Sequence, residues 1–296
     1  MTISDPPRRN VPRVPWRAGA LSLAIPGLGH VYAGHGRRGL AIFGLVALSC
    51  WAQALLALGD SLTVGSFWLI RAVRIGGSGL ALLDSVRLAR RYRGEYLLND
   101  TNRWYAYLSI GFVGALLLAT PLGAVQVFRV PARSMVPTIA VGDWIVANRW
   151  SYRRAEPKRG DVIVFHFPMN PAETYLKRVV GLPGETVEIH DRRVVVDGRE
   201  IDDPWGHCPD GRRIGSAGAD CGRATPRLDS MSATRVPEQG YFVLGDDRQQ
   251  SQDSRFWGPV PRDLLVGKIV GIYWSWDGRR HLPRLDRIGS LTAPQQ

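Results

Sequence analysis

The feature that most constrains this chain is a stretch of 20 residues, 39–58, in which no side chain carries a charge. A helix of about 20 apolar residues can cross the ~30 Å hydrocarbon core of a bilayer, because each residue adds about 1.5 Å. A second run, 104–128, is also uncharged. The sequence therefore predicts an α-helical membrane region, residues 18–128, in the N-terminal half of the chain.

Three other segments lie before or within this region. Residues 1–17 carry four prolines and four arginines, which is typical of a disordered basic arm. Residues 18–33 are uncharged but short and broken by a Pro-Gly pair, so an interfacial or re-entrant segment is expected. Residues 62–84 are predicted as a further span, although Arg71 and Arg74 interrupt them. We interpret these arginines as reaching for the interface, with a lipid or partner contact as the alternative.

The charge distribution favours a membrane over nucleic acid as the basic region's neighbour. Residues 1–103 hold 13 Lys and Arg against 5 Asp and Glu, a net charge of +8, out of +12 for the whole chain. The excess of positive charge thus lies beside the apolar runs, and no basic stripe with interleaved aromatics indicates nucleic-acid binding. The positive-inside rule places the basic loop 87–103 in the cytoplasm and everything after Phe128 outside it.

The second half has the pattern of short strands. Runs of β-branched and aromatic residues are bounded by Gly, Pro or Asp. Strands are expected at 144–147, 162–165, 176–180, 186–189, 194–196, 241–244 and 269–274. This predicts an all-β domain of many short strands over residues 129–278, interrupted by a long insertion, 202–238, and followed by a disordered polar tail, 279–296.

The three cysteines fall in two different settings. Cys50 lies in an apolar run and is expected to be an inert buried thiol. Cys208 and Cys221 lie in the insertion, and an oxidising compartment would allow a disulfide between them, with two free thiols as the alternative. A zinc site is disfavoured because His207 is the one further ligand nearby. The insertion is distant in sequence from the motifs described next, so we expect the bridge to affect the insertion alone.

Four sequence blocks follow one another in the second half. The first, ARSMVPT at 132–138, runs directly into GDWIV at 142–146. The others are GDVIVF at 160–165, YLKRVVGLPG at 175–184 and GDDRQQSQDSR at 245–255. Their content and order resemble type I signal peptidases, the membrane-anchored serine proteases with a Ser/Lys dyad. The resemblance covers residues 130–276, about half of the chain.

The residues themselves agree with this chemistry. A serine hydroxyl is a weak nucleophile and needs a base. The histidines of this half lie in none of the four blocks. Lys177 lies among Leu176, Val179 and Val180, and burial there would lower its pKa so that the amine could accept a proton. The resemblance implies that Ser134 is the nucleophile and Lys177 the general base.

The resemblance also implies supporting roles in the last block. Ser251 corresponds to a hydroxyl that orients the lysine. Asp253 and Arg255 correspond to a structural ion pair beside the site, and Asp246 and Arg248 belong to the same block. Each of these is an expectation about position as well as about role.

Substrate binding is expected at two apolar side chains, Met135 and Leu176, which would help form pockets for small residues. The chain departs from part of the family at two positions. Ala132 stands where some members have a serine that supplies a second oxyanion donor, and Asp247 stands where many have asparagine. The backbone amide of Ser134 remains the expected first oxyanion donor.

The sequence as a whole predicts a membrane-bound endopeptidase. Its expected reaction is removal of N-terminal signal peptides from exported precursors at the bacterial inner membrane, on the periplasmic side. The expected partners are those precursors and the bilayer, with no cofactor, metal or nucleic acid. One alternative is a Ser/Lys maturation enzyme with a narrow substrate range, of the pilin or conjugation type. Another is a catalytically silent membrane scaffold, which intact Ser134 and Lys177 disfavour.

Overall fold

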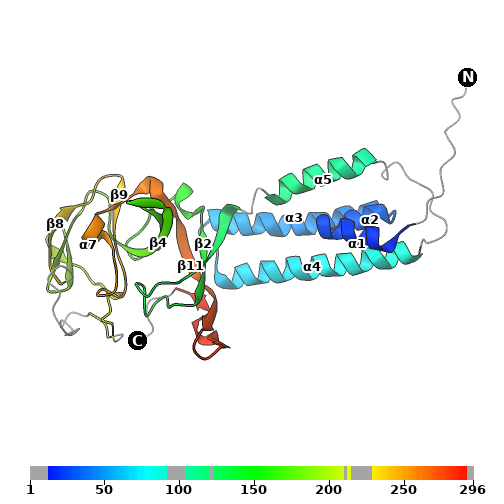
Figure 1. The fold of residues 1–296 in the computed structure, drawn as a ribbon. Helices are drawn as coiled ribbons and strands as arrows, with labels where there is room; N and C mark the ends of the chain where they lie inside the picture. Colours follow the sequence, from blue (N-terminus) through cyan, green and yellow to red (C-terminus); the bar gives the residue numbers. More distant parts are fainter. Residues whose placement is uncertain (1–12, 92–103, 120–122, 210–211, 215–228, 292–296) are drawn as a thin grey trace, which may run out of the picture. The chain divides into compact units, whose positions relative to one another are not determined.

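A computed structural model describes most of the chain, in two compact units (Figure 1). The described residues are 13–91, 104–119, 123–209, 212–214 and 229–291. The helical unit comprises residues 1–56 and 66–123, and the β unit comprises 57–65 and 124–296. An N-terminal set of helices is thus followed by a β-rich domain, as the sequence predicts.

The helical unit opens with two short helices. They are α1 (Pro15–Ala24) and α2 (Leu28–Tyr32), and the predicted break falls between them. Gly27 has φ 94°, and a Cβ there would lie 2.1 Å from the carbonyl oxygen of Gly39, so this turn requires glycine. Part of the predicted basic arm, residues 1–12, lies outside the described residues.

Two long helices follow, α3 (Gly36–Leu58) and α4 (Val64–Arg91). Both are long and apolar enough to cross a membrane. Arg71 lies eight residues into the 28-residue α4, and its guanidinium lies over the ring of Phe67 at 4.6 Å. Arg71 therefore interrupts the apolar sequence of α4 at a position away from both ends of the helix.

The third predicted span is wrong at its C-terminal end. Helix α5 covers Trp104–Ala119 instead of 104–128, and residues 125–129 form a strand, β1 (Val125–Arg129). The VQVF run alternates and is β-branched, and it pairs antiparallel with β2 (Asp143–Asn148). Pro121 between the two elements has no backbone N–H to continue a helix. Uncharged composition alone did not separate helix from strand here.

The β unit contains two sheets. The larger has the strand order β1-β2-β11-β3-β4-β9-β10, with β12 and β13 pairing to β11, and the smaller has the order β7-β6-β5-β8. The remaining strands of the large sheet are β3 (Val162–Phe167), β4 (Asn170–Gly181), β9 (Gly240–Leu244), β10 (Val260–Pro261), β11 (Leu265–Asp277), β12 (Leu282–Pro283) and β13 (Gly289–Ser290). The small sheet consists of β5 (Thr186–His190), β6 (Arg193–Val196), β7 (Arg199–Glu200) and β8 (Met231–Arg235). Every strand expected from the sequence is present, and each is longer than expected.

Two segments predicted to lack regular structure contain strands. Strand β8 lies inside the insertion and pairs with β5. The predicted tail, 279–296, contains β12 and β13, which pair with β11. The tail folds back because Asp143, fully buried, binds Arg284 at 3.2 Å and Arg287 at 2.8 Å. A buried carboxylate requires such partners, and they lie more than 140 residues away in sequence.

The turn between α3 and α4 belongs to the β unit and not to the helices around it. The side-chain amide of Asn148 donates to the carbonyl of Ala57 at 2.7 Å. Asp60 accepts a hydrogen bond from Ser151 Oγ at 3.0 Å and pairs with Lys268 Nζ at 3.1 Å. The turn is therefore held by one buried hydrogen bond and by a charged cluster.

Candidate active site

Ser134 lies in the loop that joins β1 to β2. The loop is closed at its base because Val130 N donates to Asp143 O at 2.9 Å and Gly142 N donates to Val130 O at 3.1 Å. The next residue, Met135, is 1% exposed and packs in the core with Ile145 and Val164. Anchors on both sides of Ser134 thus fix its backbone.

Lys177 reaches this serine from the middle of β4. The strand pairs Lys177 with Ile163 on β3, and the side chain is 4% exposed. Its Nζ lies 2.8 Å from Ser134 Oγ and 3.0 Å from the carbonyl oxygen of Leu176. The predicted nucleophile and base, 43 residues apart, are therefore in hydrogen-bond contact.

Burial makes this lysine a usable base. Desolvation lowers the pKa of Lys177 from 10.5 to about 8, because the charged ammonium loses water. Asp253 and Asp246 raise it in part, and Arg255 lowers it. A substantial fraction of the amine is then neutral near pH 8 and can accept the proton of Ser134.

The last motif block, 245–255, packs against the main chain of Ser134. Asp247 N donates to Ser134 O at 3.1 Å, and Gly245 N donates to Asp253 Oδ2 at 3.0 Å. A Cβ at Gly245 would lie 2.2 Å from Ser251 Oγ and 2.5 Å from Ser134 O. Glycine is thus required where this block and the nucleophile loop approach most closely.

Asp253 and Arg255 form the ion pair that the sequence led us to expect. Arg255 Nε lies 2.8 Å from Asp253 Oδ1, with both side chains buried, and Arg255 Nη2 donates to the carbonyl of Arg248 at 2.7 Å. Burial alone would raise the pKa of Asp253, but the adjacent Arg255 outweighs burial and holds this pKa below its usual range. Asp253 is therefore ionised near the lysine.

A second buried ion pair was not predicted. Arg178 binds Asp246 through two hydrogen bonds, of 2.8 and 2.6 Å, and donates to the carbonyl of Gly160 at 2.7 Å. Its guanidinium also lies over the ring of Trp205 at 5.0 Å. Successive residues of a strand point to opposite faces, so Arg178, directly after Lys177 in a buried strand, needed a partner on the other face.

The insertion contacts the last block, which corrects the expectation that it lies apart. Asp203 pairs with Arg248 at 2.5 Å. The backbone of His207 donates to Asp246 O at 2.7 Å and accepts from Arg248 N at 3.1 Å. The following residue, Cys208, is buried and disulfide-bonded. Cys50 is a free buried thiol, and Cys221 lies outside the described residues.

Ser251 lies beside the site, but its predicted role remains a prediction. The residue is buried, and its hydroxyl lies near the carboxylate of Asp253, whose pKa it helps to lower. Its position next to Gly245 puts the hydroxyl close to the main chain of Ser134.

A pocket of about 290 Å³ opens beside the dyad. Both predicted substrate-binding residues, Met135 and Leu176, line it together with Phe128, Ile145 and Val164. Ala132 also lines it. Such a pocket suits a small apolar side chain placed next to the reacting serine. Within the described part of the chain, no three His, Cys, Asp or Glu side chains are grouped as a metal site would require.

Comparison with known proteins identifies the family. The family model for signal peptidase, peptidase S26, matches residues 103–274. The chain belongs to this family. Signal peptidase I of Pseudomonas fluorescens is 33% identical over 276 residues, covering 75% of this chain and 97% of that protein. Signal peptidase I of Aquifex aeolicus (strain VF5) is 34% identical over 217 residues, covering 58% of this chain and 83% of that protein.

A crystal structure of a signal peptidase I from Enterococcus faecalis V583 is 31% identical and covers 38% of this chain and 97% of its own. The TM-score of this superposition is 0.32, so the relationship rests on the sequences. Membership in the signal peptidase family makes the chain a serine endopeptidase of the signal-peptide-cleaving type.

The dyad predicts the behaviour of three variants. Ser134→Ala and Lys177→Ala should each lower cleavage by at least about a thousandfold while thermal unfolding is nearly unchanged, because they remove the nucleophile or the base. Lys177→Arg should be equally inactive, because a guanidinium does not give up its proton in a protein. Substantial turnover by Lys177→Arg, measured on a peptide substrate, would exclude the lysine-base mechanism.

The lowered pKa of Lys177 predicts a pH profile. The active form is the neutral amine, which is lost as pH falls below a pKa of about 8. Log kcat/KM should therefore rise by about one unit per pH unit up to this pKa and then level off. The measurement is peptide cleavage between pH 6 and pH 10, and a profile that is flat or falling between pH 6 and pH 8 would contradict the assignment.

Proposed function

We propose that this chain removes N-terminal signal peptides from exported precursor proteins, with Ser134 as nucleophile and Lys177 as general base. The observation that carries the proposal is the 2.8 Å contact between Lys177 Nζ and Ser134 Oγ in a buried site. A lysine whose pKa burial lowers to about 8 has little structural purpose there unless it accepts a proton.

The chemistry is acyl transfer in two steps. Ser134 Oγ attacks the scissile carbonyl while its proton passes to Lys177, and the resulting ammonium then protonates the departing amine of the mature protein. Water, deprotonated by the same lysine, hydrolyses the acyl-enzyme and releases the signal peptide. Within the described part of the chain the backbone N–H of Ser134 makes no hydrogen bond, which leaves it available to the oxyanion.

The sheet offers the substrate a place to add as a strand. Strand β4 pairs with β3 from Asn170 to Arg178, whereas its pairing with β9 begins only at Arg178. Residues 174–176 therefore keep one unpaired edge, and they line the pocket beside the dyad. A precursor lying along this edge would insert alternate side chains, those one and three residues before the cut, toward the apolar pocket.

The proposed setting is the plasma membrane of a bacterium. Apolar N-terminal helices anchor the chain, and α3 and α4 have the length and composition of membrane spans. We propose that both cross the bilayer, that α5 forms a further span, and that the β unit is extracytoplasmic. The arginines at the start of α3 and the end of α4 support this orientation through the positive-inside rule.

One experiment tests the reaction. Detergent-solubilised protein is incubated with a secretory precursor, and the cut is located by mass spectrometry. We expect a single cut after a small residue. A matched precursor with tryptophan at that position should resist cleavage, because the pocket of about 290 Å³ suits a small side chain and not an indole. Cleavage of pilin-type precursors alone would favour the narrow-substrate alternative, and no cleavage by folded protein would favour the silent scaffold.

The orientation has its own test. A cysteine placed at residue 95 should be protected from an impermeant thiol reagent in cells with an intact inner membrane, and one at residue 200 should be labelled. Arg90 and Arg91 at the end of α4 motivate this expectation. Labelling at 200 only after the inner membrane has been opened would refute it.

We further propose that Cys208 and Cys221 are joined to each other. Support comes from Cys208, which is disulfide-bonded, and from Cys50, which is free and buried. Closing a loop of this size would stabilise the fold by about 3 kcal/mol. The backbone of His207 is hydrogen-bonded to that of Asp246 and Arg248. Breaking the disulfide should therefore disturb the position of the last motif block beside Ser134.

Reduction should therefore lower both the thermal stability of the β unit and its peptidase activity. The matched control is Cys50→Ala, which should change neither response to reductant. Non-reducing peptide mapping should recover one peptide pair containing Cys208 and Cys221. Finding both thiols free in protein isolated from its native compartment would reject the bridge.

A further inference from the structure

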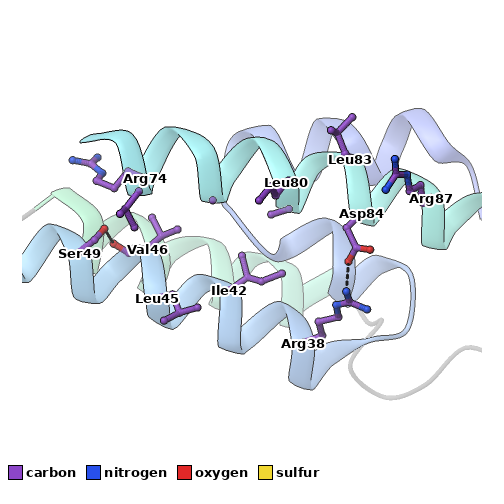
Figure 2. A pocket seen from close by; sticks show the side chains of 13 residues that line it. Arg38, Ile42, Leu45, Val46, Ser49, Arg74, Leu80, Leu83, Asp84 and Arg87 are labelled. Carbon is purple, nitrogen blue, oxygen red and sulfur yellow. Dashed lines mark hydrogen bonds and ion pairs between the residues drawn. The ribbon is translucent and has the colours of Figure 1, made fainter. Parts of the chain in front are cut away.

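A groove of about 610 Å³ lies between α3 and α4, within the helical unit (Figure 2). Aliphatic side chains from both helices line it, among them Ile42, Leu45, Leu80 and Leu83. Leu45 is 68% exposed and Leu80 is 71% exposed. If these helices cross the bilayer, as proposed above, this exposed apolar surface faces hydrocarbon and not water.

Glycine keeps the groove open on the α4 side. Gly77 lines it, and a Cβ at this position would meet no atom within 4 Å. Glycine in the middle of a helix costs about 1 kcal/mol relative to alanine. A long apolar side chain at Gly77 would occupy the space that the groove now offers.

One end of the groove is basic. Figure 2 shows Arg38, Asp84 and Arg87 together at this end, with Arg74 at the opposite end. Asp84 is already engaged by Arg38 Nη2 at 3.0 Å and by His30 Nε2 at 2.8 Å. Within the described residues of the helical unit, no acidic side chain pairs with Arg87.

The whole helical unit has the same imbalance. Its described residues include Asp84 as the one acidic side chain, and they include no lysine. The arginines there are Arg13, Arg17, Arg37, Arg38, Arg71, Arg74, Arg87, Arg90 and Arg91. Arginine is the side chain best suited to phosphate, because its planar fork donates two parallel hydrogen bonds.

We propose that this groove binds one anionic glycerophospholipid. Arg38 and Arg87 hold its phosphate, and an acyl chain lies along Ile42, Leu45 and Leu80 toward Gly77. The inference rests on the proposed membrane position of the helices. A free phosphate would use the basic end alone. A zwitterionic phospholipid has the same phosphate but would add the positive charge of its choline to an end of the groove that is already basic.

The dimensions agree with a lipid in one leaflet. Arg87 and Gly77 are ten residues apart on α4, which corresponds to about 15 Å along the helix. This is about half of the ~30 Å hydrocarbon core. The apolar part of the groove therefore has the depth that one acyl chain occupies, and Arg74 and Ser49 lie beyond it.

The headgroup contact can be tested by native mass spectrometry of the full-length protein released from detergent micelles. The micelles contain either phosphatidylglycerol or phosphatidylcholine, and the readout is the fraction of protein carrying one lipid. Wild type should retain phosphatidylglycerol in preference. The double variant Arg38→Gln, Arg87→Gln should retain it about tenfold less or weaker still, because charge-assisted hydrogen bonds are lost.

The chain provides a matched control. Arg37 and Arg90 are exposed, lie at the same helix ends and do not line the groove. The double variant Arg37→Gln, Arg90→Gln removes the same charge and should stay within about twofold of wild type. Equal loss in both double variants, or equal retention of both lipids by wild type, would overturn the proposal in favour of general attraction to charge.

The acyl contact needs a second pair of variants. Gly77→Leu should fill the groove and reduce retention of phosphatidylglycerol, whereas Gly76→Leu, also with open space around it and outside the groove, should not. Inorganic phosphate in excess should fail to displace the lipid. Displacement by phosphate, or no effect of Gly77→Leu, would reduce the site to an anion contact and contradict the proposal.

Failure of this inference can be told apart from failure of the proposed function. Cleavage of a peptide in detergent is measured for every variant, and it should persist because none of the substituted residues touches the dyad. Loss of lipid selectivity with intact cleavage would refute the groove alone. Inactive wild type would refute the proposed reaction, and wild-type protein that does not fractionate with bilayers would refute the membrane position.

Discussion

The site in the β unit depends on burying Lys177 away from water without pairing its amine with a carboxylate. Two aspartates lie close enough to raise the pKa of Lys177, and either one, left unpaired, would favour the ammonium. Each is instead bound to an arginine, Asp246 to Arg178 and Asp253 to Arg255. Burial is then the largest influence on Lys177, and its pKa falls to about 8. The ion pairs around the site thus act by occupying the acids.

This arrangement explains why the site draws on so many segments. A buried ion pair that loses one partner leaves an unpaired charge, at a cost of about 3–5 kcal/mol. Arg248, from the block that carries Asp246, is itself balanced by Asp203 at the start of the insertion. The insertion is therefore part of the structure that supports the site around Lys177, although none of its described residues lines the pocket beside Ser134. If Cys208 is oxidised only outside the cytoplasm, the support of the catalytic loops is completed after that part of the chain has been exported.

The sequence was sufficient to predict that Ser134 and Lys177 lie together, and to predict most strands. Ser134 and Lys177 could be assigned because their blocks resemble a known family, and short runs of β-branched residues marked the strands. Arg178 was missed, although a charge inside the strand pattern LKRVV was a usable signal of a buried partner. The predicted end of the third span was wrong because an uncharged run does not distinguish an apolar helix from a strand buried in a sheet. The prediction of a disordered tail was wrong because the tail is held by Asp143, which lies more than 140 residues earlier. No local sequence pattern indicates such a pairing.

The turn between α3 and α4 has a consequence for any attempt to study the peptidase without its helices. This turn is part of the β unit, where Asn148 donates to the carbonyl of Ala57 and Lys268 pairs with Asp60. A soluble fragment that begins at β1 would lack this turn and would expose the surface around Asn148 and Lys268 that the turn contacts. The buried amide of Asn148 would lose its acceptor, and Lys268 would lose Asp60 and keep Asp161, the other of its two acidic partners among the described residues. A soluble version of the β unit would therefore have to carry the turn with it, grafted or supplied as a separate peptide.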